Sequence, residues 1–146
     1  MAPITASIEI ARPPEAVFAY IDDLSRHAEW QGQLQEVTVE TEGPTRVGSR
    51  ARERRKVPGG VQEMTYEITE HDPPRRASFR GIDGPVRAFG TVTVAPADGG
   101  SRVTLELDFE GHGLGKLLLP LVRRQARKEV PQDQKLLKER LESQST

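Results

Sequence analysis

The sequence predicts an α+β fold in which a curved antiparallel sheet of about seven strands encloses one long C-terminal helix, with two short helices after the first strand. Two observations support this prediction. Segments in which apolar and polar residues alternate are separated by turns that are too short for parallel crossovers. A long segment with apolar residues at helical spacing follows the last of these strands. With 146 residues the chain fits a single domain, 1–146, whose core we expect over about 4–141.

The first part of the chain predicts one strand and two short helices. Ile4–Ile10 alternates apolar and polar residues, which is typical of a half-buried strand. A helix is expected to begin at Pro13-Pro14-Glu15, because proline is tolerated in a first turn and an acidic residue there suits the helix dipole. Asp22–Ser25 then indicates a break and a new cap, which predicts a second helix over about Ser25–Trp30.

Six more strands are predicted up to Glu110, and turn-forming clusters of Gly, Pro and Asp separate them. They are Leu34–Glu42, Ser49–Val57, Val61–His71, Arg76–Gly81, Val86–Ala95 and Arg102–Glu110. The last strand has a clear apolar face, formed by Val103, Leu105, Leu107 and Phe109. Only one face of this strand is therefore expected to be buried.

The hairpin at Pro58-Gly59 predicts which residues face each other. A two-residue turn sets Glu53 opposite Met64 and Ala51 opposite Tyr66, and a four-residue turn keeps the same faces. The outer face then carries a solvated cross-strand charge ladder, formed by Arg50, Arg54, Glu63 and Glu67.

The inner face of the same hairpin predicts a pocket. It carries Ala51, Glu53, Arg55, Met64, Tyr66 and Ile68. This face is apolar except for Glu53, Arg55 and the tyrosine hydroxyl, and buried charges need either each other or a water-accessible cavity. The alternative is that one strand end is exposed, or that a bulge reverses the alternation.

The last helical segment, which ends at about Leu141, is expected to pack on the concave face of the sheet. Its apolar residues are Leu114, Leu117, Leu118, Leu121, Val122, Ala126, Val130, Leu137 and Leu141. Pro131 is expected to kink or break the helix. Basic residues occupy the remaining positions: Lys116, Arg123, Arg124, Arg127 and Lys128. We interpret them as a solvated face, and contact with anionic lipid is the alternative.

The composition excludes several classes of protein. A net charge of −1 lacks the basic excess of a nucleic-acid binder, and the run Arg50–Lys56 is spread over both faces of its strand. The chain has no cysteine, so disulfides, thiolate catalysis and cysteine-ligated metals are excluded. No apolar stretch approaches the ~18 residues of a membrane helix, and the first residues lack a signal-peptide pattern. We expect a cytoplasmic protein with no nucleic-acid partner and no stable membrane insertion.

No metal site or cofactor is expected. His27, His71 and His112 lie in different predicted elements and share no local ligand motif. The glycine-rich segment 111–116 is not a phosphate-binding loop, because Leu117 stands where such a loop needs Ser or Thr.

Short motifs in a fixed order give the chain a family resemblance. They are Ile8-Glu9-Ile10 with Pro14-Glu15-Ala16-Val17-Phe18, Asp23-Leu24 leading to Glu29-Trp30, Val47-Gly48-Ser49, Tyr66-Glu67-Ile68-Thr69-Glu70 with Pro73-Pro74-Arg75-Arg76, Gly99-Gly100-Ser101-Arg102-Val103-Thr104, and Gly113-Leu114-Gly115-Lys116. Over about Ile4 to Leu141 the chain resembles the START-related SRPBCC superfamily, in its polyketide cyclase/dehydrase and lipid-transport branch. The resemblance implies a helix-grip fold, like that of START domains and the birch-pollen allergen, with a cavity between sheet and helix. Members bind lipids, polyketides, quinones or plant hormones; only some are enzymes, and no catalytic signature is shared by all.

Three hypotheses for function follow. The first is binding of a small hydrophobic or amphipathic molecule by a pocket that comprises Trp30, Ala51, Met64, Ile68, Phe79, Leu105, Leu107, Leu118 and Val122. The second is an aromatase/cyclase-type enzyme in which Glu53 is the base and Arg55 and Tyr66 are donors. The third is a protein-interaction module. A homodimer stays open, and Trp30 is alternatively a cap on the core.

Overall fold

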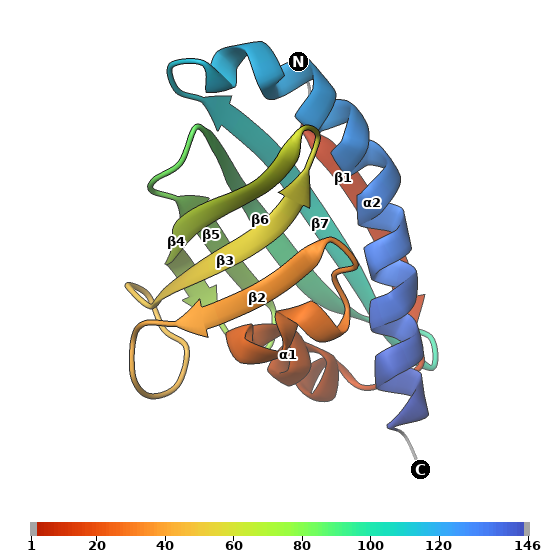
Figure 1. The fold of residues 1–146 in the computed structure, drawn as a ribbon. Helices are drawn as coiled ribbons and strands as arrows, with labels where there is room; N and C mark the ends of the chain where they lie inside the picture. Colours follow the sequence, from red (N-terminus) through yellow and green to blue (C-terminus); the bar gives the residue numbers. More distant parts are fainter. Residues whose placement is uncertain (1–2, 145–146) are drawn as a thin grey trace.

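The computed structural model describes residues 3–144 and contains one sheet that curls around a long helix (Figure 1). The elements are β1 (Ile4–Ile10), α1 (Pro14–Asp22), η1 (Leu24–Glu29), β2 (Leu34–Val39), β3 (Arg50–Val57), β4 (Gly60–Asp72), β5 (Arg76–Gly81), β6 (Val86–Ala97), β7 (Gly100–Gly111) and α2 (Gly115–Ser143). The predicted α+β helix-grip fold is confirmed.

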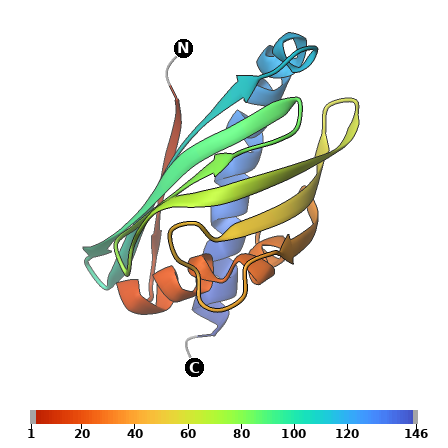
Figure 2. The same ribbon diagram turned by 90° about the vertical axis from the view of Figure 1, so that its left-hand side faces the viewer.

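The sheet is an antiparallel meander from β2 to β7, and β1 pairs beside β7 to give the order β1-β7-β6-β5-β4-β3-β2. Both views show α2 on its concave side, while α1 and η1 lie across one end (Figures 1 and 2). Register shifts in β2 and β4, at Leu34/Glu36 and Ile68/Glu70, interrupt the regular pairing. Such bulges increase local bending and twist, which the curled sheet requires.

The predicted pairing of β3 with β4 is confirmed. Glu53 lies opposite Met64 and Ala51 opposite Tyr66, as the two-residue turn requires. The outer charge ladder also forms, with the Arg50–Glu67 pair at 4.0 Å and the Arg54–Glu63 pair at 3.8 Å. The inner face of these two strands is therefore fixed by the turn chemistry together with the period-two pattern.

The predicted second short helix is confirmed, whereas the prediction that Pro131 breaks the last helix was wrong. The second helix is a 3₁₀ helix that begins at Leu24, where the Asp23 carboxylate accepts a hydrogen bond from the amide of Ser25. Pro131 does not break α2, which continues through it to Ser143. Residues after the proline are buried against the rest of the fold, notably Leu137, and this packing outweighs one lost backbone hydrogen bond. The bend that Figures 1 and 2 show lies instead in the first turns of α2, the part that contains Pro120.

The prediction that every apolar residue of α2 packs on the sheet was also wrong. The buried ones are Ala126, Val130, Leu137 and Leu141, whereas Leu114, Leu117, Leu118 and Leu121 are exposed. At about 100° per residue, the exposed leucines lie on the opposite side of the helix from the buried stripe. Gly115 packs so closely on the Pro85 carbonyl that an added Cβ would lie 1.8 Å from its oxygen. This contact holds the other side of the first turn against Pro85, the residue before β6, and the leucines face outward.

The core has two parts. One joins β1, α1 and the end of α2 through Ile10, Val17, Phe18, Tyr20, Ile21, Val94, Val103, Leu137 and Leu141. The other lies beneath η1 and comprises Leu24, Ala51, Met64, Tyr66 and Ile68. The space between the sheet and α2 is not filled completely by these side chains.

Candidate functional site

A cavity of about 220 Å³ lies between the concave face of the sheet, α1, η1 and α2. Most of its lining is apolar and includes Phe18, Ile21, Leu24, Met64, Ile68, Phe79, Val92, Val103, Leu105, Leu107, Phe109, Val122, Ala126, Val130 and Leu137. These side chains come from all layers of the fold, because the inward-facing positions of several strands converge on one face of α2. The volume far exceeds the roughly 10–15 Å³ that a cavity needs to hold one water molecule.

The structure brings most of the predicted binding residues to this cavity. They are Trp30, Met64, Ile68, Phe79, Leu105, Leu107 and Val122. Two do not line it. Ala51 is completely buried in the core beneath η1, and its short side chain does not reach the cavity. Leu118 lies on the exposed side of α2. The sequence pattern alone did not distinguish it from the apolar residues that the helix buries.

The predicted catalytic candidates come together at a polar corner of the cavity. Arg55 Nε donates to Glu53 Oε1 at 3.1 Å, and Arg55 also donates to the side-chain oxygen of Gln31. Burial disfavours the charge of Arg55, but the attraction of Glu53, Asp133 and Glu129 outweighs it and raises the pKa of the guanidinium. Three carboxylates therefore lie near this guanidinium, and burial raises the pKa of one of them, Asp133.

Two buried hydrogen-bond donors beside this corner have no partner among the described residues: the Tyr66 hydroxyl and Trp30 Nε1. Both residues line the cavity, and the Tyr66 ring packs edge-on against Phe79 at 5.8 Å. Burial, reinforced by the negative charge of Glu53, raises the pKa of Tyr66, so the hydroxyl stays protonated. An unpaired buried donor costs about 1–3 kcal/mol, which makes both groups candidates for contact with a bound molecule.

His27 also lines the cavity, although the sequence did not predict it there. Its Nε2 lies 2.7 Å from the Ile21 carbonyl oxygen, and its ring packs edge-on against Trp30 at 5.3 Å. Since a carbonyl only accepts, the neutral ring carries its proton on Nε2 and leaves Nδ1 as an acceptor. Burial is the main cause that lowers the pKa of His27 below its ordinary 6.5. A single histidine in a short polar segment gives no sequence signal for such burial.

His27 predicts a pH dependence of stability. Because its folded-state pKa is lowered, the unfolded chain binds more protons below about pH 6.5, and the free energy of unfolding falls as the pH drops. We expect a slope of at most about 1.4 kcal/mol per pH unit from this group. Urea unfolding of the wild type and of His27→Gln between pH 5 and 7.5 measures the difference.

His112→Gln is the matched control, because the side chain of His112 is 46% exposed. The control should retain the wild-type slope and His27→Gln should lose part of it. Equal slopes of the free energy of unfolding against pH for the wild type and His27→Gln would contradict a lowered pKa of His27.

The two ends of the cavity differ. At the α1 end, buried Phe18, Ile21 and Leu137 close it, and Asp22 forms a pair with His71 at 2.9 Å. At the other end the lining passes to half-buried Val57, the last residue of β3, and to half-buried Pro58 in the β3–β4 turn. The cavity therefore opens toward that turn.

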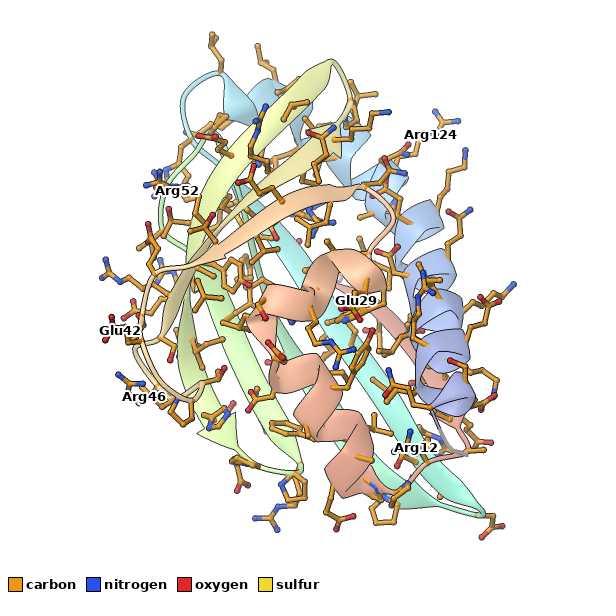
Figure 3. All side chains as sticks on the ribbon, turned by 60° about the horizontal axis from the view of Figure 1, so that its bottom comes forward. Arg12, Glu29, Glu42, Arg46, Arg52 and Arg124 are labelled. Carbon is orange, nitrogen blue, oxygen red and sulfur yellow. The ribbon has the colours of Figure 1, made fainter. Side chains whose placement is uncertain are left out.

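Hydrogen bonds close the side between η1 and α2. The Gly32 amide donates to Asp133 at 3.0 Å, and Arg140 donates to the Glu29 carbonyl at 3.0 Å. Figure 3 shows Glu29 between these two elements. A molecule is thus expected to enter at the β3–β4 turn and not across the edge of β2.

Within residues 3–144, no three His, Asp or Glu side chains are grouped so that they could hold a metal ion. Nor does any helix of that range combine the length and the apolar run needed to cross a membrane.

Comparison with known proteins adds a family and several structural relatives. The family model described as "Polyketide cyclase / dehydrase and lipid transport" matches residues 1–142. The chain is similar to TTHA0849 from Thermus thermophilus, with 27% identity, a TM-score of 0.83 and coverage of 98% of this chain and 99% of that one. It is also similar to a START superfamily protein from Mycobacterium smegmatis (13% identity, TM-score 0.76, 99% and 100% coverage). A third is the Zhui aromatase/cyclase from Streptomyces sp. R1128 (17% identity, TM-score 0.73, 97% and 91% coverage). The last two likenesses concern the fold alone.

Proposed function

Since the chain belongs to the polyketide cyclase/dehydrase and lipid transport family, we propose that it binds one small, uncharged and largely apolar molecule in the cavity. Family and fold support a ligand-binding or a polyketide cyclase-like function. Our proposal adds the chemical class of the ligand. The observation that carries it is the enclosed apolar space with one polar corner. Apolar walls supply the affinity, and the few polar groups orient the ligand.

The charges of the corner favour an uncharged ligand. Glu53, Glu129 and Asp133 surround Arg55, whose guanidinium already pairs with Glu53. A ligand carboxylate would place a further acidic group beside these three in a poorly hydrated space. A ketone, quinone, ester or ether oxygen instead accepts a hydrogen bond without adding charge. The Tyr66 hydroxyl and Trp30 Nε1 are donors that lack an acceptor among the described residues.

We expect a ligand with a neutral ketone group to bind more tightly than ligands of similar shape that lack this group. The probes are 2-acetylnaphthalene, 2-ethylnaphthalene and 2-naphthoate, which have nearly the same shape, and isothermal titration calorimetry measures each. One good hydrogen bond is worth about 1–1.5 kcal/mol, so the ketone should bind roughly tenfold more tightly than the hydrocarbon. The carboxylate should bind most weakly.

Tyr66→Phe should remove much of the advantage of the ketone and leave the affinity for the hydrocarbon almost unchanged. Its fold should remain intact, because the hydroxyl has no partner to lose among the described residues. Tyr20→Phe is the control, since the Tyr20 hydroxyl is engaged with Glu29 outside the cavity lining. Failure of all three probes to bind, with no small molecule in native mass spectra of fresh protein, would contradict the proposal.

Catalysis is the second candidate function, and the convergence of Glu53, Arg55 and Tyr66 favours it. A protonated Tyr66 could donate to a developing enolate oxygen while Glu53 accepts a proton beside the carbonyl. In the structure, however, Glu53 is held by Arg55 at 3.1 Å. Conversion of a bound polyketone, detected by mass spectrometry and lost in Glu53→Gln, separates an enzyme from a binder.

A further inference from the structure

The first turns of α2 present an exposed apolar surface. Leu114, Leu117 and Leu121 are 81%, 75% and 52% exposed, and Leu118 is 36% exposed. Their spacing of three and four residues places them on one side of the helix. Large apolar side chains gathered in this way on a surface are typical of a docking site.

Basic residues adjoin these leucines. Arg124 and Lys128 follow Leu121 by three and seven residues, so they share its side of the helix. No described carboxylate pairs with Arg124 or Lys128. Figure 3 shows Arg124 extending from α2 away from the sheet. We call the four leucines with Arg124 and Lys128 the leucine–arginine surface.

The charge of this segment differs from that of the whole chain. Between Glu110 and Glu129 there are five Lys and Arg residues and no Asp or Glu, although the net charge of the chain is −1. One of the five, Arg123, pairs with Asp108 at 3.0 Å, and the others give this short segment a local positive charge. A partner that matches it must combine negative charge with an apolar layer.

The leucine–arginine surface lies at the open end of the cavity. Val122 and Gln125 of the same helix line the cavity, together with Val57 at the end of β3 and Pro58 of the β3–β4 turn. Both ribbon views show that turn and the first turns of α2 at the same end of the molecule (Figures 1 and 2). A partner on this surface would adjoin the opening.

We propose that the leucine–arginine surface docks the protein on an anionic lipid bilayer. Exposed leucines enter the boundary between headgroups and acyl chains, and the basic residues face the negative headgroups. A second copy of the chain fits less well, because two such surfaces would bring like charges together. A nucleic acid would match the charge but would leave the leucines without an apolar partner. The proposal does not depend on which ligand the cavity binds.

Flotation of the full chain with lipid vesicles tests the proposal. We expect binding to phosphatidylcholine vesicles that contain about a third phosphatidylglycerol, weak binding to pure phosphatidylcholine, and loss of binding in high salt. Arg124→Gln/Lys128→Gln should weaken binding about 30-fold, since each basic residue near the surface contributes about a factor of five. Leu117→Ala/Leu121→Ala should weaken it about tenfold or more.

Two matched variants control for charge and apolar area. Arg52→Gln/Lys135→Gln removes the same charge from exposed positions elsewhere, with Arg52 on the outer side of the sheet in Figure 3. Val47→Ala removes an exposed apolar side chain from a distant loop. Both should bind vesicles like the wild type.

The result that overturns the proposal is equal loss in the control and surface variants, or no vesicle binding by the wild type. A wild-type dimer that Leu117→Ala/Leu121→Ala converts to a monomer, without vesicle binding, would assign the surface to a second copy instead. Ligand titrations of the same variants keep this test separate from the proposed function, because the cavity residues are unchanged.

Discussion

Replacing Leu137 with alanine is expected to lower the free energy of unfolding by about 2–5 kcal/mol. Leu137 is 1% exposed and packs in the core that joins α2 to α1 and β1. The loss combines the transfer free energy of the removed carbons with the cavity they leave, and the site already adjoins an empty space. Urea unfolding followed by circular dichroism measures the change.

Leu117→Ala on the same helix is the matched control for this prediction. Leu117 is 75% exposed, so the identical chemical change should alter stability by less than about 0.5 kcal/mol. Similar losses in the two variants would mean that α2 does not bury the side that contains Leu137.

Replacing Arg55 with methionine is expected to cost about 2–4 kcal/mol of folding free energy. The change keeps much of the apolar stem but leaves Glu53, Glu129 and Asp133 near one another without their cation. Removing one member of a buried pair leaves an uncompensated charge. Because a quarter of the Arg55 side chain is exposed, we expect less than the full cost of a completely buried pair. Urea unfolding at pH 7 measures it.

The double variant Glu53→Gln/Arg55→Met tests the cause of this loss. Removing one carboxylate along with the guanidinium lowers the repulsion, so the double variant should be more stable than Arg55→Met alone. Arg52→Met, an exposed neighbour on the outer face of β3, should change stability little. The double variant could instead lose as much folding free energy as Glu53→Gln and Arg55→Met combined. In that case repulsion between the carboxylates would not be the reason for the instability of Arg55→Met.

The two proposals assign two separate roles to α2, one at the polar corner and one at the leucine–arginine surface. Its inner side supplies Glu129 and Asp133 to the corner, whereas its outer side carries the exposed leucines. A helix between a sheet and solvent can do this because its side chains point in all directions around the axis. We therefore expect variants of the outer side to change docking and variants of the inner side to change ligand affinity.

Local patterns in the chain were enough to define the sheet. Alternation in β3, β4 and β7 assigned Glu53, Tyr66 and Leu105 to the inner face, and the two-residue turn at Pro58-Gly59 set the register of the hairpin. These features are local, because a strand has a period of two and a short turn allows few alignments. The family resemblance rests on the same turns and core positions, and the match to residues 1–142 confirms it.

The buried side of α2 and the opening of the cavity depended instead on how distant segments pack together. Leu117 and Leu137 look equivalent in the sequence, but Gly115 packs against the Pro85 carbonyl and the first leucines face away from the sheet. His27 joined the cavity for a similar reason, since η1 folds it against Trp30. Whether a residue of α2 is buried depends on strands and helices from distant parts of the chain. The local sequence pattern does not specify how much of the helix those elements cover.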